Sequence, residues 1–103
     1  MGGLEETFVK EAFDTNWVAP LGPNVNNFEK EIAEYVGIDH ASALVSGTSA
    51  IHLAIKLLDI KAGDVVFCSS LTFAASCNPI IYEGAEPVFI DAEYDSLNMS
   101  PIA

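Results

Sequence analysis

The sequence Ser46-Gly47-Thr48-Ser49-Ala50 lies between two apolar runs, residues 41–45 and residues 51–58. The first run has the length and composition of a buried strand, and the second has those of a helix, so the small residues mark a strand-to-helix turn. The first amides of a helix lack partners within it, and the helix dipole adds partial positive charge there. Such a turn can bind a phosphate group, although serine, threonine and glycine also occur there simply as helix caps. The turn alone leaves both interpretations open.

Strands and helices alternate on the carboxyl side of this turn. Nearly continuous apolar strands are typical of a parallel sheet that is covered on both faces. The sequence therefore predicts an α/β fold, part of a three-layer α/β/α arrangement with mainly parallel strands. We expect strands at residues 41–45, 65–69 and 87–91, helices at residues 49–58 and 73–82, and a turn at residues 61–64.

Two amphipathic helices are predicted on the amino side. The first covers residues 4–14, and the second begins at Asn24 or Asn26 and ends at Gly37. Residues 15–23 between them contain two prolines, a glycine and three large apolar side chains, which predicts an irregular but partly covered loop.

Ser100-Pro101 has the pattern of a helix start, with a capping residue followed by proline at the first helical position. A helix that starts so close to the last residue of the sequence leads us to expect that the chain is a piece of a larger protein.

The composition limits the class of protein. A chain of 103 residues is at most one domain, and its 15 acidic against 4 basic residues give a formal net charge of -11. This charge disfavours nucleic acid and anionic membranes as partners.

Cys68 and Cys77 lie in apolar surroundings without metal-ligand spacing, which predicts buried free thiols in a reducing compartment. Because the sequence shows neither a signal peptide nor an apolar membrane segment, we expect a cytoplasmic protein.

Ligands of open α/β sheets bind beyond the carboxyl ends of the strands. Three predicted loops lie there, at residues 46–49, 69–73 and 91–95. Phe73 could stack on a flat ligand, or it could be a core side chain at the start of the next helix. His52, which lies among apolar residues, is better explained as a hydrogen-bonded structural residue than as a catalyst. The carboxylates at positions 91, 93 and 95 lack the spacing of a calcium loop and are interpreted as solvated.

These segments together resemble the amino-terminal part of the DegT/DnrJ/StrS family, the pyridoxal phosphate-dependent sugar aminotransferases with the aspartate-aminotransferase fold. The resemblance covers the whole chain, and the order and spacing of the motifs make it specific. The matching segments are residues 1–5, 15–23, 28–29, 46–54, 63–66, 71–75 and 84–91.

The resemblance implies roles for particular residues. Thr48 and Ser49 match the positions that bind the phosphate of pyridoxal phosphate, and Phe73 matches the aromatic residue that stacks on its ring. Trp17, Ala19 and Pro20 belong to a loop near the active-site entrance, with less defined roles. Residues 1–37 then correspond to amino-terminal helices and this entrance loop, and residues 38–103 to the start of the cofactor-binding domain. One departure is the serine pair at positions 69 and 70, where the family often has proline before Thr72-Phe73; we expect this to change loop stiffness more than chemistry.

The implied parent enzyme transfers an amino group from glutamate to a nucleotide-linked keto sugar in polysaccharide or glycan biosynthesis. In the family, the lysine that binds the cofactor covalently comes later in the sequence, and none of the four lysines present lies in a matching motif. We therefore expect no catalysis by this chain alone. The alternatives are a piece of a same-family sugar dehydratase, a non-catalytic fragment or association module, and an acidic α/β domain for another phosphorylated ligand.

The family fold also predicts contacts between chains. In that fold the first strand lies across the sheet from the next two, with later strands between them. A 103-residue chain must therefore either form a smaller sheet or borrow strands from other copies, which favours a homo-oligomer.

Overall fold

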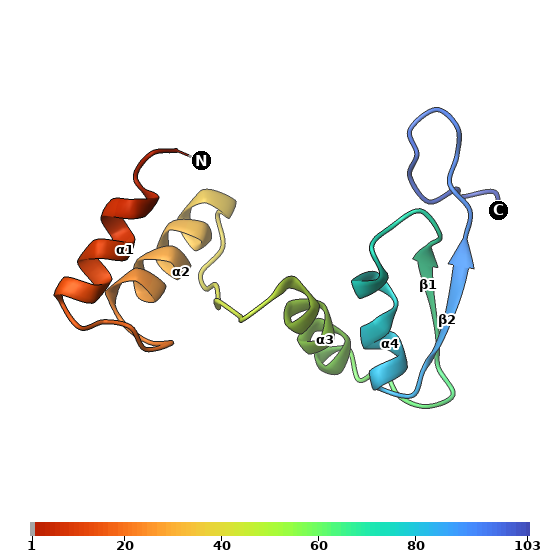
Figure 1. Ribbon diagram of the computed structural model, residues 1–103. Coiled ribbons are helices and arrows are strands. Elements are labelled where there is room, and N and C mark those ends of the chain that lie inside the picture. Colours follow the sequence, from red (N-terminus) through yellow and green to blue (C-terminus); the bar gives the residue numbers. More distant parts are fainter. Residues whose placement is uncertain (1) are drawn as a thin grey trace. The chain divides into compact units, whose positions relative to one another are not determined.

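The computed structural model describes residues 2–103, which form two compact units, residues 2–43 and residues 44–103 (Figure 1). Each unit is described by itself. The first contains the helices α1 (Glu5–Asp14) and α2 (Pro23–Val36). The second contains α3 (Gly47–Leu57), β1 (Val65–Ser69), the 3₁₀ helix η1 (Ala74–Ser76), α4 (Asn78–Tyr82) and β2 (Glu86–Ile90).

The first unit contains both predicted amphipathic helices. α2 nevertheless begins at Pro23 with Gly22 as its N-cap, so the predicted start at Asn24 or Asn26 is wrong. Proline is well suited to the first helical position because that position needs no amide hydrogen bond and proline already has a helical φ. The helix ends as predicted at Gly37, which has a left-handed φ of 77° and donates its amide hydrogen to the Ala33 carbonyl at 2.9 Å.

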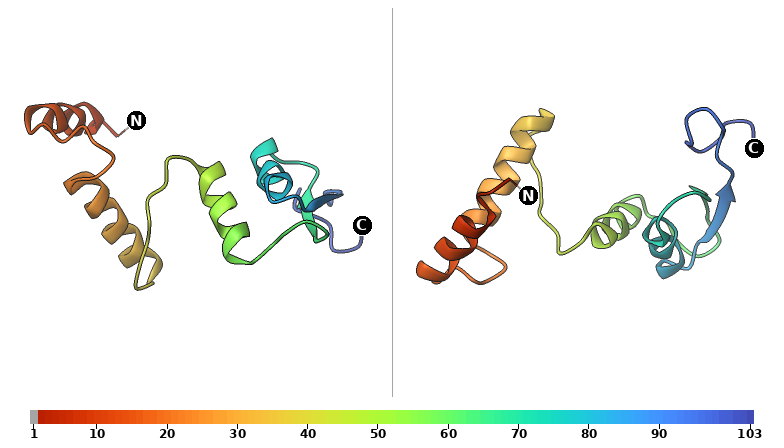
Figure 2. Two further views of the ribbon diagram at one scale, coloured as in Figure 1. Left: turned by 90° about the horizontal axis from the view of Figure 1, so that it is seen from below. Right: turned by 45° about the horizontal axis from the view of Figure 1, so that its top comes forward.

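The second unit is built on the parallel pair β1–β2, whose register runs from Val65↔Glu86 to Ser69↔Ile90. Both strands agree with the predicted ranges to within one residue. α4 packs against β2, and α3 packs against η1 and α4, so that α4 lies between α3 and the strands in both views of Figure 2. The prediction of an α/β fold with parallel strands is confirmed, and the described chain supplies helices to one face of the sheet.

The core of this unit is small and consists of the buried residues Ile55, Cys68, Ile80 and Ala85. Both cysteines are free, but only Cys68 is buried, whereas Cys77 is half-buried. Burial raises the pKa of the Cys68 thiol above its ordinary value, and the nearby Cys77 adds to this effect.

Three predicted elements differ from the structure. Residues 41–45 form no strand within the described chain, because a strand requires a neighbour for its ladder of hydrogen bonds and β1 and β2 pair only with each other. The helix predicted at residues 73–82 is divided into η1 and α4, since Pro79 is accommodated in the first turn of a new helix rather than inside a continuous one. Residues 101–103 are too few to form a helical turn after Ser100, although the Ser100 hydroxyl accepts hydrogen bonds from the Ile102 and Ala103 amides at 3.2 and 3.3 Å.

None of the helices within residues 2–103 has both the length and the apolar character needed to cross a membrane.

Candidate functional site

The first turn of α3 has free hydrogen-bond donors. Ser46 is the N-cap, and its Oγ accepts a hydrogen bond from the Ser49 amide at 3.1 Å and lies 3.0 Å from the Ser49 hydroxyl oxygen. The Ser46 carbonyl accepts the Ala50 amide at 3.1 Å. Within residues 2–103 the amides of Gly47 and Thr48 have no such acceptor, and the Thr48 side chain is half-buried. Two amides and the Thr48 hydroxyl are therefore available to an anion at the positive end of the helix dipole.

Phe73 lies on the loop that follows β1. The Ser70 amide extends the sheet by donating to the Ile90 carbonyl at 2.9 Å, and the hydroxyl oxygens of Thr72 and Ser76 lie 2.9 Å apart. Phe73 itself has an extended backbone and a side chain that is 81% exposed. Its ring is thus outside the core and free to contact a flat ligand.

The helix turn and the Phe73 loop lie at the same end of the second unit. α3 contacts both η1 and α4, and the carboxylate of Glu83, just after α4, is bound by side chains from the middle and end of α3. The start of α3 is consequently beside η1, where the arrowheads of β1 and β2 also end in Figure 1. This is the carboxyl edge of the sheet, where open α/β sheets bind their ligands.

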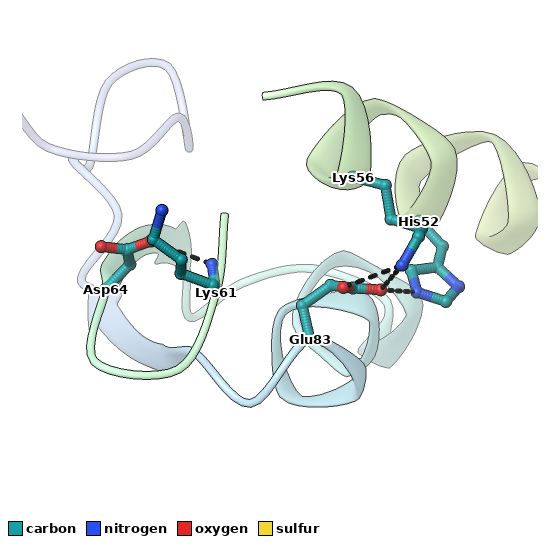
Figure 3. A network of polar contacts seen from close by, with 5 residues as sticks. All are labelled: His52, Lys56, Lys61, Asp64 and Glu83. Carbon is teal, nitrogen blue, oxygen red and sulfur yellow. Dashed lines mark hydrogen bonds and ion pairs between the residues drawn. The ribbon is translucent and has the colours of Figure 1, made fainter. Parts of the chain in front are cut away.

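A polar cluster holds α3 and α4 together (Figure 3). The Glu83 carboxylate lies 2.5 Å from Nε2 of His52, and Lys56 donates to both of its oxygens at 3.1 Å. The His52 ring also contacts the Tyr82 ring edge-to-face, with 5.4 Å between centroids. Two hydrogen bonds lower the pKa of Glu83 below its ordinary value. The bond with His52 has the larger effect, and the bond with Lys56 has the smaller one. His52 is hydrogen-bonded, as predicted.

The sequence alone did not point to Glu83. It is 31 residues away from His52, and no local pattern relates the two positions. Figure 3 also shows the predicted turn at residues 61–64, which is closed by the Lys61 amide donating to the Asp64 carboxylate at 2.9 Å.

All four lysines have carboxylate partners. The pairs are Lys10–Asp14, Lys30–Glu34, Lys56–Glu83 and Lys61–Asp59, with N–O distances from 2.5 to 3.8 Å. Three of them join residues close together in the sequence, and the fourth belongs to the Glu83 cluster. Each ammonium group is therefore engaged in an ion pair.

The predicted entrance residues Trp17, Ala19 and Pro20 belong to the first unit. The Trp17 amide donates to the Ala12 carbonyl at 2.8 Å, and its indole ring lies against Gly22. A cavity of about 130 Å³ beside Trp17 is lined by residues of α1, the loop and the start of α2. Ala19 and Pro20 are exposed. The structure thus brings Thr48, Ser49 and Phe73 to one end of the second unit and places the entrance residues in the other unit.

Comparisons with known proteins agree with this architecture. A protein of Bacillus subtilis named as a pyridoxal phosphate-dependent aminotransferase, EpsN, is 59% identical over 103 residues, which are 100% of this chain and 26% of that protein. GDP-perosamine synthase of Caulobacter vibrioides is 40% identical over 99 residues, 96% of this chain and 27% of the synthase. The crystal structure of a DegT DnrJ EryC1 StrS aminotransferase from Brucella abortus superimposes with a TM-score of 0.83 at 37% identity, covering 92% of this chain and 25% of that one.

The chain thus spans about a quarter of the length of these relatives. The family model itself matches residues 2–103, so the match includes the turn at the start of α3, the Phe73 loop and both strands. This coverage, together with the shared fold, shows that the chain belongs to the DegT/DnrJ/EryC1/StrS aminotransferase family.

Proposed function

We propose that this chain forms the part of a pyridoxal phosphate-dependent sugar aminotransferase that holds the phosphate group and one ring face of the cofactor. The observation that carries the proposal is the set of free donors on Gly47 and Thr48 at the same end of the unit as the exposed Phe73 ring. These donors fit a phosphate, because helix-end amides bind anions at contact without any basic side chain. Exposed carboxylates of this acidic chain that lie more than about 8–10 Å from the phosphate are largely screened from it by salt.

Pyridoxal phosphate, when bound, supplies the electron sink for amino-group transfer. In this chain, the Gly47 and Thr48 amides and the hydroxyls of Thr48 and Ser49 would bind the phosphate. The Ser49 amide, which donates to Ser46 Oγ, stabilises the turn that presents them. Phe73 would cover one face of the ring and exclude water from it. The names of two relatives support a nucleotide-linked keto sugar as the substrate of the whole enzyme. They are GDP-perosamine synthase and a dTDP-4-dehydro-2,3,6-trideoxy-D-glucose 4-aminotransferase of Saccharopolyspora spinosa. Glutamate as the amino donor and assembly into a homo-oligomer stay predictions from the resemblance.

We further propose that this chain binds the cofactor without turning it over. The two lysines of the second unit, Lys56 and Lys61, pair with Glu83 and Asp59 at the end of α3 and beyond it, away from the turn at the start of that helix. None of the four lysines of the chain lies in a motif that matches the cofactor-binding lysine of the family. A covalent bond to the cofactor requires an unprotonated lysine beside it. The lysine for this bond would thus come from a part of the enzyme that the chain does not include.

The test is calorimetric titration of the chain with pyridoxamine 5′-phosphate, which lacks an aldehyde and cannot react with surface lysines. Thr48→Val removes one hydrogen bond to a charged group, which contributes about 1.5–3 kcal/mol, so the affinity is expected to fall about tenfold or more. Phe73→Ala should also weaken binding, through the loss of stacking on the ring.

Two matched substitutions control for general effects. Thr7→Val on α1 makes the same chemical change at an exposed position, and Phe13→Ala removes a ring that is 70% exposed. Both should bind like the unmodified chain. Equal affinities for Thr48→Val and Thr7→Val, or no saturable binding up to millimolar ligand, would contradict a preformed phosphate site.

A further inference from the structure

The ring of Phe73 is not held in place by packing. Its side chain is 81% exposed and is not part of the core of the second unit. An aromatic side chain that moves freely loses conformational entropy when it stacks on a ligand, and this cost weakens binding. A ring that is ordered before the ligand arrives avoids the cost. For Phe73 such order has to come from the backbone on either side of it.

The amino end of the Phe73 loop is fixed on β2. The Ser70 amide donates to the Ile90 carbonyl at 2.9 Å and continues the ladder of the sheet beyond β1. The Ser70 hydroxyl donates to the Asp91 carboxylate at 3.4 Å. These contacts hold the start of the loop and do not reach Phe73, so a second restraint is needed on the carboxyl side of that residue.

Ser76 supplies two contacts across Phe73. Its amide donates to the Phe73 carbonyl at 2.9 Å. Its hydroxyl oxygen lies 2.9 Å from that of Thr72, and either hydroxyl can donate in this hydrogen bond. Phe73 is the N-cap of η1 and its side chain forms no capping hydrogen bond, so the Thr72–Ser76 pair closes the turn instead.

The Thr72–Ser76 pair acts locally. Thr72 is exposed and Ser76 is half-buried, and neither residue belongs to the core cluster. A neutral hydrogen bond between side chains at such a position contributes little to the stability of the whole unit. Its main effect is on the backbone that it encloses, which is that of Phe73.

We propose that Ser76 is a positioning residue that holds Phe73 ready to stack on the ring of the cofactor, through its hydrogen bond with Thr72. The proposal rests on the proposed function of the Phe73 loop. The apparent affinity for a ligand falls in proportion to the fraction of the protein that has the binding geometry. Removal of the Ser76 hydroxyl lowers this fraction for the ring and leaves the phosphate donors at the start of α3 unchanged.

The first measurement is calorimetric titration with pyridoxamine 5′-phosphate. Ser76→Ala should weaken binding by about two- to tenfold, which is the range of one neutral hydrogen bond. Thr72→Val removes the other half of the same pair and should have an equal effect. Ser76→Thr keeps the hydroxyl and should bind like the original chain. In a Phe73→Ala background, Ser76→Ala should have no further effect, because the ring that it orders is absent.

Inorganic phosphate separates the ring from the turn. It has no ring to stack on, and its binding is followed by the NMR signals of the Gly47 and Thr48 amides. Ser76→Ala should leave the affinity for phosphate unchanged. Ser96→Ala is the matched control, because Ser96 is an exposed serine of the same unit whose hydroxyl also has a side-chain partner, Glu93. This control should change neither affinity.

A measurement without ligand tests the ordering itself. The NMR order parameter of the Phe73 amide should be about 0.85 in the original chain and should fall toward about 0.6 in Ser76→Ala. An unchanged order parameter, or equal weakening of phosphate and pyridoxamine 5′-phosphate binding by Ser76→Ala, would overturn the proposal. If the original chain bound neither ligand, the proposed function would be wrong, and the order parameter would still decide whether Ser76 orders Phe73.

Discussion

Gly22 has a backbone conformation that favours glycine. Its φ of 141° is in a region that side chains rarely adopt, and a Cβ at this position would lie 2.8 Å from Cε3 of Trp17. We predict that Gly22→Ala destabilises the first unit by more than about 1 kcal/mol, through backbone strain and displacement of the indole ring. Because Trp17 is the only tryptophan, its fluorescence during urea denaturation measures this effect directly.

Gly47→Ala provides the comparison for this prediction. A Cβ on Gly47 would meet no atom within 4 Å, and the residue is already in the first turn of a helix. Alanine is favoured over glycine in a helix, so we expect this variant to be as stable as the original chain or slightly more stable. Equal destabilisation by the two substitutions would contradict the role assigned to the Gly22 conformation.

At the scale of elements, Glu83 joins the end of α4 to α3 through His52 and Lys56. The hydrogen bond with His52, and then that with Lys56, lowers its pKa in the folded protein below the ordinary value of 4.5. A group with a lowered folded-state pKa stabilises the fold above its unfolded pKa, and this contribution is lost as the pH falls through the folded value. We predict that Glu83→Gln lowers the free energy of unfolding at about pH 7 and has a smaller effect at about pH 3. Urea denaturation at the two pH values measures the difference.

Glu31→Gln removes an equal charge from an exposed position on α2 and should have little effect at either pH. If the effect of Glu83→Gln were the same at both pH values, the stabilisation would come from packing and not from the charged carboxylate. The same cluster explains why His52 lies on an apolar helix. The His52 ring packs edge-to-face against the Tyr82 ring, and its Nε2 atom is hydrogen-bonded with the Glu83 carboxylate.

At the scale of the whole molecule, the net charge of -11 opposes compaction. Raising the salt concentration from about 10 mM to about 150 mM shortens the Debye length from about 30 Å to about 8 Å and screens this repulsion. We predict that the chain becomes more stable with salt, and a gain of about 1 kcal/mol would raise its melting temperature by about 4–8 °C. Sodium and potassium chloride should act equally. A difference between them would indicate specific ion binding, and no rise in either salt would contradict the role of self-repulsion.

Much of the fold could be predicted from local patterns. The strand at Val65–Ser69 and the helix after Ser46 follow from apolar periodicity and capping residues, which act over a few positions. The prediction of one continuous helix over residues 73–82 was wrong. Pro79 lies in the first turn of a new helix, and apolar periodicity does not indicate such a break. The strand predicted at residues 41–45 was wrong because an apolar run becomes a strand only when another strand is beside it.

The candidate site, like the fold, could be predicted from the sequence only in part. The donors at the start of α3 follow from the sequence, since capping and the helix dipole depend on adjacent residues. The sequence also located Phe73 immediately after a strand. Three features depend on the packing of the elements. These two segments lie at the same end of one unit, Phe73 is exposed, and Glu83 contacts His52. Contacts between residues far apart in the sequence depend on how helices pack on the sheet, which no local pattern encodes.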